Sequence, residues 1–595
     1  MPGSPFWRYS GGMSQRAAFC VAFVAGLAVS VSCGGNNGSG FHSGGGSKGS
    51  GGFGGSGGTS GFQLEGGGGT SGSGGGGNLT CAQAAASKSY IGCDYWPTVS
   101  SNSVWSIFDF TVVVANTQST TANVTVTGPG GVNQMVTVLP DQLTNIYLPW
   151  VPALKGVDGD NCGSVVPLAG SVTAPKSAYH LVSSIPVTVY QFNALEYKGA
   201  GGPPGKDWSA CPGNTLCKQP GAPPTAIGCF SYTNDASLLL PSTAMTGNYR
   251  VTGEHGWSNA MEGSYFVVTA TQDSTAVTVT LSTTANVIAG PGIAATGPGG
   301  TLSFGLNAGD VVEIVGGRLD NSDLSGSLVQ ANKPIQVLAG MTCTDEPIYV
   351  GDTNPAQACD HLESSVLPAE TLGKDYVVTV PTSPHAAVIG AKVRFYGNVD
   401  GTSLTYSPSQ PPGCPSTLNA GQVVECVGTK ACPYTGQLGP AVANCVTESF
   451  EVMGNNAFAV STFMLGGSIT DPAAMVSMQL GDPSMSPMVA TQQYRTRYIF
   501  LAPSDYTESY ADVVAPPGTT LTLDGATAAG MTTPVNSTYS VTRILLGPGN
   551  NGAHVLTGTN PFGVQVIGYG NYTSYQYPAG LDLAQIAPPP PPPVK

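Results

Sequence analysis

The sequence has few charged residues. Asp, Glu, Lys and Arg make up 9% of its 595 residues, against about 25% in ordinary soluble proteins. The formal net charge is −14 and no cluster of Lys or Arg offsets it, which argues against the basic surface that nucleic-acid-binding proteins need. Hydroxyl, amide and glycine backbone groups must therefore keep the protein in solution.

Helical periodicity is also lacking. No window longer than about ten residues repeats its apolar positions at helical spacing. Apolar and hydroxylic residues instead alternate, as in 123–127 (NVTVT) and 276–281 (AVTVTL), and turn sequences such as 128–131 (GPGG) separate these runs. Alternation of this kind is typical of half-buried strands. We predict an all-β fold.

Motifs with a catalytic or metal-binding context are missing as well. HExxH, P-loop and dinucleotide-binding patterns do not occur in a suitable setting. Residues 54–58 (GGSGG) match the hydrolase pattern G-x-S-x-G, but they lack the strand–turn–helix context that activates the serine. No two cysteines are as close as the C-x2–4-C pairs of zinc sites. We therefore expect no catalytic, cofactor-binding or metal-binding residue.

Two acidic stretches resemble fragments of calcium loops, 158–161 (DGDN) and 320–323 (DNSD). Neither has the Glu at position 12 or the flanking helices of an EF-hand. Polar surface turns explain both stretches, and calcium is kept as the alternative.

Two histidines have acidic neighbours. His361 lies beside Cys359, but a Cys–His nucleophile is disfavoured because Cys359 has a nearby disulfide partner in Cys343. We expect His361 to begin a structural loop. His255 is flanked by Glu254, and we expect a loop histidine there, with a binding surface that includes Trp257 and Glu262 as the alternative.

Residues 1–33 resemble an export signal, with Arg8 and Arg16 before an apolar run at 17–31 that is too short to span a membrane. The run ends at Cys33 in a sequence similar to a bacterial lipobox, although Ser30 stands where Leu is usual. We expect lipidation at Cys33, with simple secretion as the alternative. Residues 34–80 are rich in Gly and Ser and should form a flexible linker.

A related pattern recurs about four times within residues 81–587. Each unit closes with a run of the type x-x-P-apolar-x-V, although the third copy lacks the proline; the runs are 184–189, 333–337, 456–460 and 560–564. We predict tandem β-sandwich-like units at about 93–200, 229–343, 359–467 and 488–583, or alternatively a single larger circular arrangement of β units. The stretch 329–381 would be the joint between two units. Residues 588–595 should form an exposed polyproline tail.

The sequence has 14 cysteines. Cys20 lies in the signal and Cys33 is the lipidation candidate, which leaves twelve in the globular part. An even number in an exported protein favours disulfides. From proximity alone we expect the pairs Cys81–Cys93, Cys211–Cys217, Cys343–Cys359, Cys414–Cys426 and Cys432–Cys445, with Cys162–Cys229 left to form the sixth.

Four tyrosines lie within nine residues near the C-terminus: Tyr569, Tyr572, Tyr575 and Tyr577. Tyrosine with Ser and Asn offers an adaptable contact surface, as in antibody paratopes. We consider these residues a candidate binding surface, the alternative being that the rings pack over the last unit.

Two stretches resemble the N-terminal domain of the IgGFc-binding protein family: 359–377 (CDHLESSVLPAETLGKDYV) and 561–580, which begins PFGVQVIGYG and ends YPAG. The resemblance covers most of residues 90–583. Together with the lipobox-like signal and the linker, it is similar to a myxobacterial-type surface lipoprotein. The resemblance implies adhesion or ligand binding at the cell surface, without a residue set that would confer Fc binding.

We therefore expect a binding or adhesion protein of the outer membrane or cell surface, or a secreted one, that recognises an extracellular protein or glycan without catalysis. The first alternative is a structural component of the cell surface or extracellular matrix. The second is a secreted hydrolase on a β scaffold.

Overall fold

The computed structural model describes residues 79–158, 168–217, 225–226, 228–258, 260–347, 358–427, 430–431, 444–475, 478–549 and 552–590. The expected signal, Cys33 and nearly all of the linker lie outside these residues and stay predictions. Strands dominate, and the α-helices are short: α1 (Cys81–Ser87), α2 (Pro152–Lys155) and α3 (Gly467–Thr470). Within the described part, no helix has the length and apolar character needed to span a bilayer.

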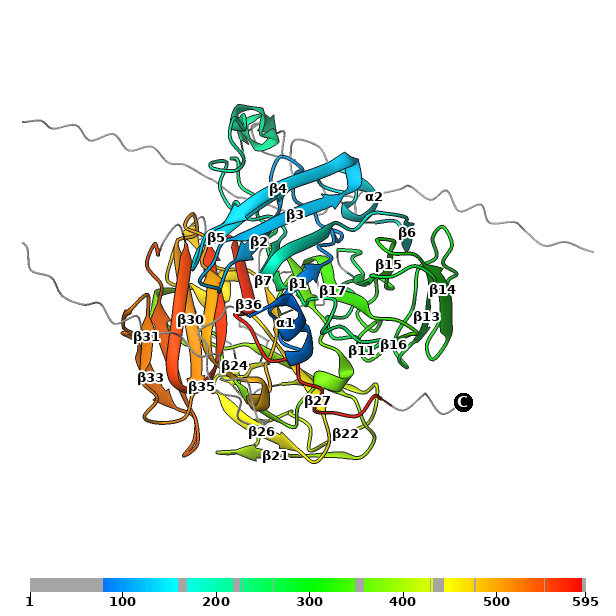
Figure 1. Ribbon diagram of the computed structural model, residues 1–595. Coiled ribbons are helices and arrows are strands. Elements are labelled where there is room, and N and C mark those ends of the chain that lie inside the picture. Colours follow the sequence, from blue (N-terminus) through cyan, green and yellow to red (C-terminus); the bar gives the residue numbers. More distant parts are fainter. Residues whose placement is uncertain are drawn as a thin grey trace, which may run out of the picture.

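The strands form four units that follow one another along the chain (Figure 1). The sheets of the units repeat the same internal strand order. Unit 1 contains β1 (Gly92–Tyr95), β2 (Phe110–Ala115), β3 (Ala122–Gly128), β4 (Val132–Val138), β5 (Leu143–Leu148), β7 (His180–Phe192) and β10 (Ala236–Leu238). Unit 2 contains β11 (Asn248–Arg250), β12 (Ser264–Ala270), β13 (Thr275–Thr280), β14 (Thr301–Leu306), β15 (Val311–Val315), β16 (Leu328–Ala331), β17 (Ile335–Thr344) and β18 (Asp360–Ser365).

Unit 3 contains β19 (Asp375–Val378), β20 (Lys392–Gly397), β21 (Thr402–Ser407), β22 (Thr417–Leu418), β23 (Val423–Cys426), β26 (Phe450–Gly454), β27 (Phe458–Phe463) and β28 (Met485–Pro487). Unit 4 contains β29 (Arg495–Leu501), β30 (Glu508–Ala515), β31 (Leu521–Leu523), β32 (Ala526–Thr527), β33 (Met531–Pro534), β34 (Ser540–Leu545), β35 (Ala553–Gly570) and β36 (Thr573–Pro578). Short strands outside this scheme are β6 (Val172–Ala174), β8 (Leu216–Cys217), β9 (Thr225–Ala226), β24 (Lys430–Ala431) and β25 (Asn444–Cys445).

Each unit is a sandwich of an outer and an inner sheet joined by its closing run, which is one long strand in units 1 and 4 (β7 and β35) and two successive strands in units 2 and 3 (β16–β17 and β26–β27). In unit 2 the outer sheet has the order β11-β16-β13-β14, and the inner sheet has the order β18-β17-β12-β15, extended by β6. Unit 3 repeats this scheme with β19-β26-β21-β22 and β23-β20-β27-β28. The closing run crosses between the sheets at Pro334 in unit 2, where a residue without an N–H removes no ladder bond.

A tyrosine in each opening strand marks the repeat. The hydroxyls of Tyr95, Tyr249, Tyr376 and Tyr498 donate to carbonyls of the closing strands, at Val187, Ile335, Phe458 and Phe562 respectively. The four rings are buried. Four equivalent buried bonds identify four related units, as the sequence pattern predicted.

In units 1, 2 and 3 the final strand lies beyond the end that the sequence predicted. Strand β10 pairs with β7 although it begins after residue 200, and β18 pairs with β17 although we expected residue 359 to open the next unit. His361 accordingly lies in a buried strand, so the structural loop expected there is wrong. The physical reason is that the part of the closing run that lies in the inner sheet would otherwise have one edge without hydrogen-bond partners, and the final strand supplies them.

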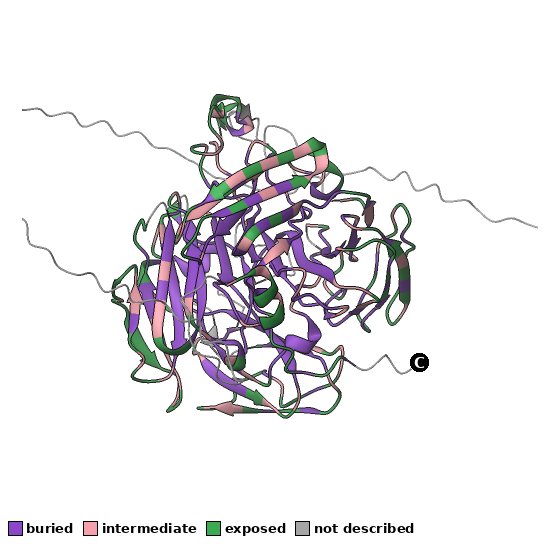
Figure 2. Ribbon diagram, viewed as in Figure 1, coloured by how far each residue is buried: buried purple, intermediate pink, exposed green. Residues whose placement is uncertain are grey.

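The units close into a ring around these final strands. Strands β10, β18, β28 and β36 contact one another in cyclic order. The circle is closed between the segment before unit 1 and the segment after unit 4. The N–H of Tyr90 donates to the carbonyl of Leu581 (3.3 Å), and the N–H of Leu583 donates to the carbonyl of Lys88 (2.9 Å). The all-β fold of sandwich-like units is confirmed, and the units are arranged circularly. Buried residues fill the centre, while exposed ones lie on the outer hairpins (Figure 2).

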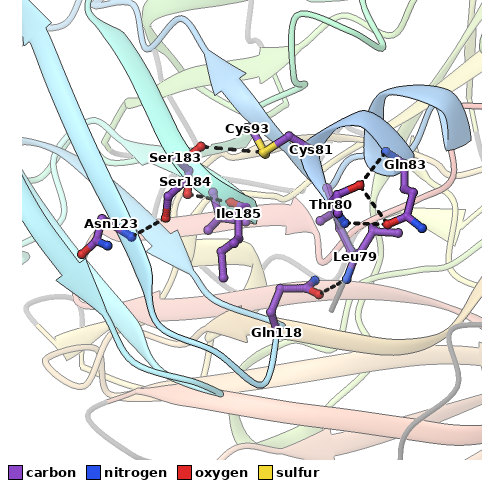
Figure 3. Close-up of a disulfide and its surroundings, with 12 residues drawn as sticks. Leu79, Thr80, Cys81, Gln83, Cys93, Gln118, Asn123, Ser183, Ser184 and Ile185 are labelled. Atoms are coloured by element: carbon purple, nitrogen blue, oxygen red, sulfur yellow. Dashed lines mark hydrogen bonds between the residues drawn. A yellow bond between two sulfur atoms is a disulfide. The ribbon is translucent and has the colours of Figure 1, made fainter. Parts of the chain in front are cut away.

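Disulfides staple the ring, and they indicate an exported protein because such bonds persist in oxidising compartments. Three expected pairs are confirmed: Cys81–Cys93, Cys343–Cys359 and Cys414–Cys426. Figure 3 shows the first, at the point where the chain enters the fold; Thr80 caps α1 there, and the Leu79 N–H donates to Gln118 Oε1 (3.0 Å).

One group of expected pairs is wrong. Cys211 is bonded to Cys229, and not to Cys217, so the Cys162–Cys229 pair is excluded too. Pairing each cysteine with its neighbour along the chain gave the wrong result here. The segment between Cys211 and Cys229, which contains β8 and β9, forms an excursion from the sheets, and its end at Cys229 returns beside Cys211. Cys445 is also in a disulfide, and the expected partner Cys432 lies outside the described residues, as does Cys162.

Candidate binding surfaces and the central junction

The tyrosine cluster near the C-terminus is not a binding surface. Tyr569, Tyr575 and Tyr577 are at most 1% exposed, and Tyr572 is half-buried. Tyr575 and Tyr577 lie in β36, the innermost strand of unit 4, and their rings pack against unit 1, with the ring centroids of Tyr190 and Tyr577 5.0 Å apart. The candidate surface is therefore wrong, and the alternative, packing of the rings, is confirmed. Tyr575 and Tyr577 join the last unit to the first, whereas Tyr569 packs against unit 3, where its hydroxyl donates to the carbonyl of Thr382 (2.8 Å).

A buried carboxylate at the centre links all four units. Asp235 lies immediately before β10 of unit 1 and is fully buried. Its Oδ1 accepts from the Ser484 hydroxyl (2.8 Å) and the Gln576 N–H (3.4 Å), and its Oδ2 accepts from the N–H groups of Glu363 (3.1 Å) and Met485 (3.2 Å). These donors belong to units 2, 3 and 4 or to the segments leading into them. Burial raises the pKa of Asp235, and the donors oppose that shift.

Glu363, beside His361, has a second set of buried donors. Its Oε1 accepts from Ser237 and Gln191 (both 2.7 Å), and its Oε2 accepts from Ser100 and Asn193 (both 2.6 Å). Burial raises its pKa, and the hydrogen bonds oppose that shift. His361 is fully buried, and desolvation lowers its pKa to about 3. These groups are enclosed and hydrogen-bonded, which suits a structural junction and offers no access to a substrate.

The two stretches considered for calcium form turns where they are described. Asp320 accepts from both the N–H (2.8 Å) and the hydroxyl (2.7 Å) of Ser258. Asp158 accepts from Ser106 and from Lys155 Nζ (2.5 Å), and residues 159–161 lie outside the described part.

The outer sheet of unit 1 presents a flat exposed face of three rows. Strand pairing aligns Met135 with Thr125 and Val182, and it aligns Asn133 with Thr127 and His180. Met135 is 79% exposed. We define the unit 1 outer face by its nine residues: Asn123, Thr125, Thr127, Asn133, Met135, Thr137, His180, Val182 and Ser184. It holds one ionisable group, His180, whose Nε2 lies 2.7 Å from Asp94 Oδ2 of the adjoining strand β1. Figure 2 shows how exposure alternates along β3 and β4.

This arrangement recurs in unit 2. There Thr280 lies opposite Thr301 and Thr278 lies opposite Ser303, on the outward face of the β13–β14 hairpin. The alternating runs that indicated strands in the sequence therefore also supply the hydroxyl-rich surface. Interfaces are depleted of Asp, Glu and Lys and enriched in Met, and the unit 1 outer face matches that composition.

A tryptophan cluster beside this sheet was missed by the sequence analysis. Trp105, Trp150 and Trp208 surround Phe108 and the Cys211–Cys229 disulfide, at the base of the excursion that projects at the top of Figure 1. Lys206 Nζ lies 4.5 Å from the centroid of the Trp208 ring. Trp150 and Trp208 are half-buried, so much of the cluster serves packing. Tryptophan is rare in this sequence, and that rarity is the signal that could have drawn attention to these three residues.

Glu196 and Glu262 should make stability depend on pH. Burial is the main cause that raises the pKa of Glu196 to about 7, reinforced by Asp109 and opposed by Lys206; it raises the pKa of Glu262 to about 8. Unfolded glutamate titrates near 4.3, so above that pH the folded chain binds more protons than the unfolded chain. We expect the free energy of unfolding to fall by up to about 1.4 kcal/mol per pH unit per group as pH rises to these values.

Thermal melts between about pH 5 and about pH 9 would measure this slope. E196Q and E262Q should each flatten it, whereas D207N, at a fully exposed carboxylate, should leave it unchanged. A melting temperature that rises with pH across this window would contradict the assignment.

Comparison with known proteins gives one informative match. A family model described as IgGFc binding protein matches residues 235–568, more than half of the chain. Among solved structures, "Crystal structure of tetra-tandem repeat in extending region of large adhesion protein" aligns over 82% of this chain and 99% of its own, at 10% identity and a TM-score of 0.07. That likeness is too low to carry an argument. None of the curated proteins matches.

Proposed function

Because the chain belongs to the IgGFc binding protein family, we propose that it is an exported, cell-surface or secreted binding protein that recognises an extracellular protein or glycan. The unit 1 outer face is the observation that carries this proposal. It is largely exposed, and His180, which pairs with Asp94 of the adjoining strand β1, is the one ionisable group among its nine residues. A lipid anchor at Cys33 and the linker at 34–80 would display the ring away from the membrane.

The proposal assigns binding and no catalysis. The hollow lined by Ser101, Glu262, Tyr265 and Arg318, among others, has room for about one water molecule. The central carboxylates are enclosed, as described above. Recognition on a flat face must therefore come from many modest contacts, and hydroxyl and amide groups suit both glycans and polypeptide backbones.

The full chain should be applied to arrays of glycans and extracellular proteins, with IgG Fc among the probes. We expect saturable binding to at least one probe. M135E should weaken it by about tenfold or more, because it places an unmatched charge at the centre of a desolvated contact. M475E is the matched control, since Met475 is 68% exposed and lies between α3 and β28 of unit 3, not in this sheet.

Equal loss in both variants would exclude the unit 1 outer face as the contact surface. Absence of any saturable ligand would instead favour the structural-component alternative. Palmitate labelling that disappears in C33A would test the anchor separately.

A further inference from the structure

His255 is held in one tautomer at the joint between units 2 and 3. It follows β11 in a loop, and its Nδ1 lies 2.7 Å from the carbonyl oxygen of Gly256. A carbonyl can only accept, so Nδ1 carries a proton, and in the neutral ring Nε2 presents a lone pair. This backbone bond is the arrangement that orients metal-binding histidines in proteins.

Two carboxylates converge on that lone pair. Nε2 lies 3.3 Å from Glu254 Oε1, and strand β23 of unit 3 supplies Glu425. Ligand atoms of Glu254, His255 and Glu425 all lie within 4.8 Å of one another. Tetrahedral ligands at about 2.1 Å from Zn²⁺ are about 3.4 Å apart, which is close to the Glu254–His255 separation. Lone pairs and carboxylates facing one another repel unless a cation lies between them.

The surrounding charges leave room for a divalent ion. Lys392 Nζ pairs with the other oxygen of Glu254 and with Glu346, and Arg394 pairs with Asp323. Four carboxylates (Glu254, Glu346, Asp323 and Glu425) face these two cations, so carboxylates outnumber the cations even though burial raises the pKa of Glu346. Arg394 Nη1 stands 3.7 Å from Glu254 Oε1, and Lys392 Nζ stands 4.0 Å from Glu425 Oε2, so both cations border the position.

The position is also accessible. The side chains of His255 and Glu425 are 23% and 39% exposed, whereas that of Glu254 is fully buried. Lys392 Nζ forms an ion pair with Glu254 Oε2, and Arg394 Nη1 lies 3.7 Å from Glu254 Oε1, so two cations fix this carboxylate in place. An ion could enter from solvent on the Glu425 side and meet a charged, fixed oxygen ligand.

We propose that Glu254, His255 and Glu425 form a binding site for Zn²⁺ or a similar transition-metal ion, with a remaining position open to solvent. One imidazole and two carboxylates are a ligand set that zinc accepts. Because Glu254 and His255 belong to unit 2 and Glu425 belongs to unit 3, the ion would clamp these two units. This site does not depend on the proposed outer-face function.

The full chain, freed of metal with a chelator, should be titrated with ZnCl2 in a calorimeter. We expect about one Zn²⁺ per chain and a higher melting temperature with zinc. E425Q and H255N should each weaken binding by about tenfold or more. E425Q is the cleaner variant, because Glu425 is the most exposed of the three ligands, and a circular dichroism spectrum would verify its fold.

H180N is the matched control. His180 Nε2 also faces a carboxylate, Asp94 Oδ2 at 2.7 Å, but Asp94 is its one such partner among the described residues, so H180N should bind zinc like the wild type. Co²⁺ gives a second readout, through a visible absorption band that H255N removes. No saturable zinc binding, or binding unchanged in both E425Q and H255N, would overturn the proposal and leave a proton-mediated His255–Glu254 pair.

Discussion

Ending the chain after Pro578 is expected to open the ring and to remove most of its stability. The residues that follow include Leu581 and Leu583, whose exposed fractions are 1% and 0%. Burying each of these side chains contributes about 1.5–3 kcal/mol to the free energy of unfolding. The same residues also provide the backbone pairing with the segment around Lys88 and Tyr90. A loss of about 5 kcal/mol is comparable with the whole free energy of unfolding of a typical domain.

A second truncation, after Pro590, is the control. It removes the end of the polyproline tail, which should be solvated as an extended polyproline helix, and it should leave the melting temperature unchanged. Melting curves of the two truncations and the full chain make the comparison. If both truncations melt like the full chain, the pairing between the chain ends does not close the ring.

The local features of this fold could be predicted from the sequence. Runs such as 276–281 became strand β13 because alternation alone determines which face of a strand is buried. Cys343 and Cys359 pair because β17 and β18 are neighbouring antiparallel strands, so the end of one lies beside the start of the other. The family resemblance was readable for the same reason, since its motifs are contiguous segments around β18 and β35.

The circular arrangement could not be predicted in the same way. Asp235 contacts groups up to 341 residues away along the chain, and nothing in its neighbours distinguishes it from a turn aspartate. The tyrosines of β36 carry the composition of a binding loop, yet closure of the ring buries them. His255 and Glu425 meet only because unit 3 packs on unit 2, so the candidate metal ligands had no sequence spacing to reveal them.

Replacing Asp235 with alanine should be among the most damaging single changes in this protein. It would leave the Ser484 hydroxyl and the N–H groups of Glu363, Met485 and Gln576 without their acceptor, in a site from which water is excluded. Each buried donor left unsatisfied costs about 1–3 kcal/mol, so a loss of about 4 kcal/mol or more is expected. D273A is the control, because Asp273 is exposed and accepts one bond, from Ala308; it should cost less than about 1.5 kcal/mol.

D235N keeps the experiment informative if D235A does not fold. Asparagine retains one acceptor oxygen and turns an NH2 group toward donors, so about half of the contacts are lost and one side becomes repulsive. Denaturant unfolding of D235N, S484A and the double variant would measure the coupling between the two side chains. A coupling energy near zero, or D235A within about 1 kcal/mol of the wild type, would mean that the four inner strands are held by apolar packing alone. A large coupling would show that one carboxylate, shared by four units, enforces their register around the ring.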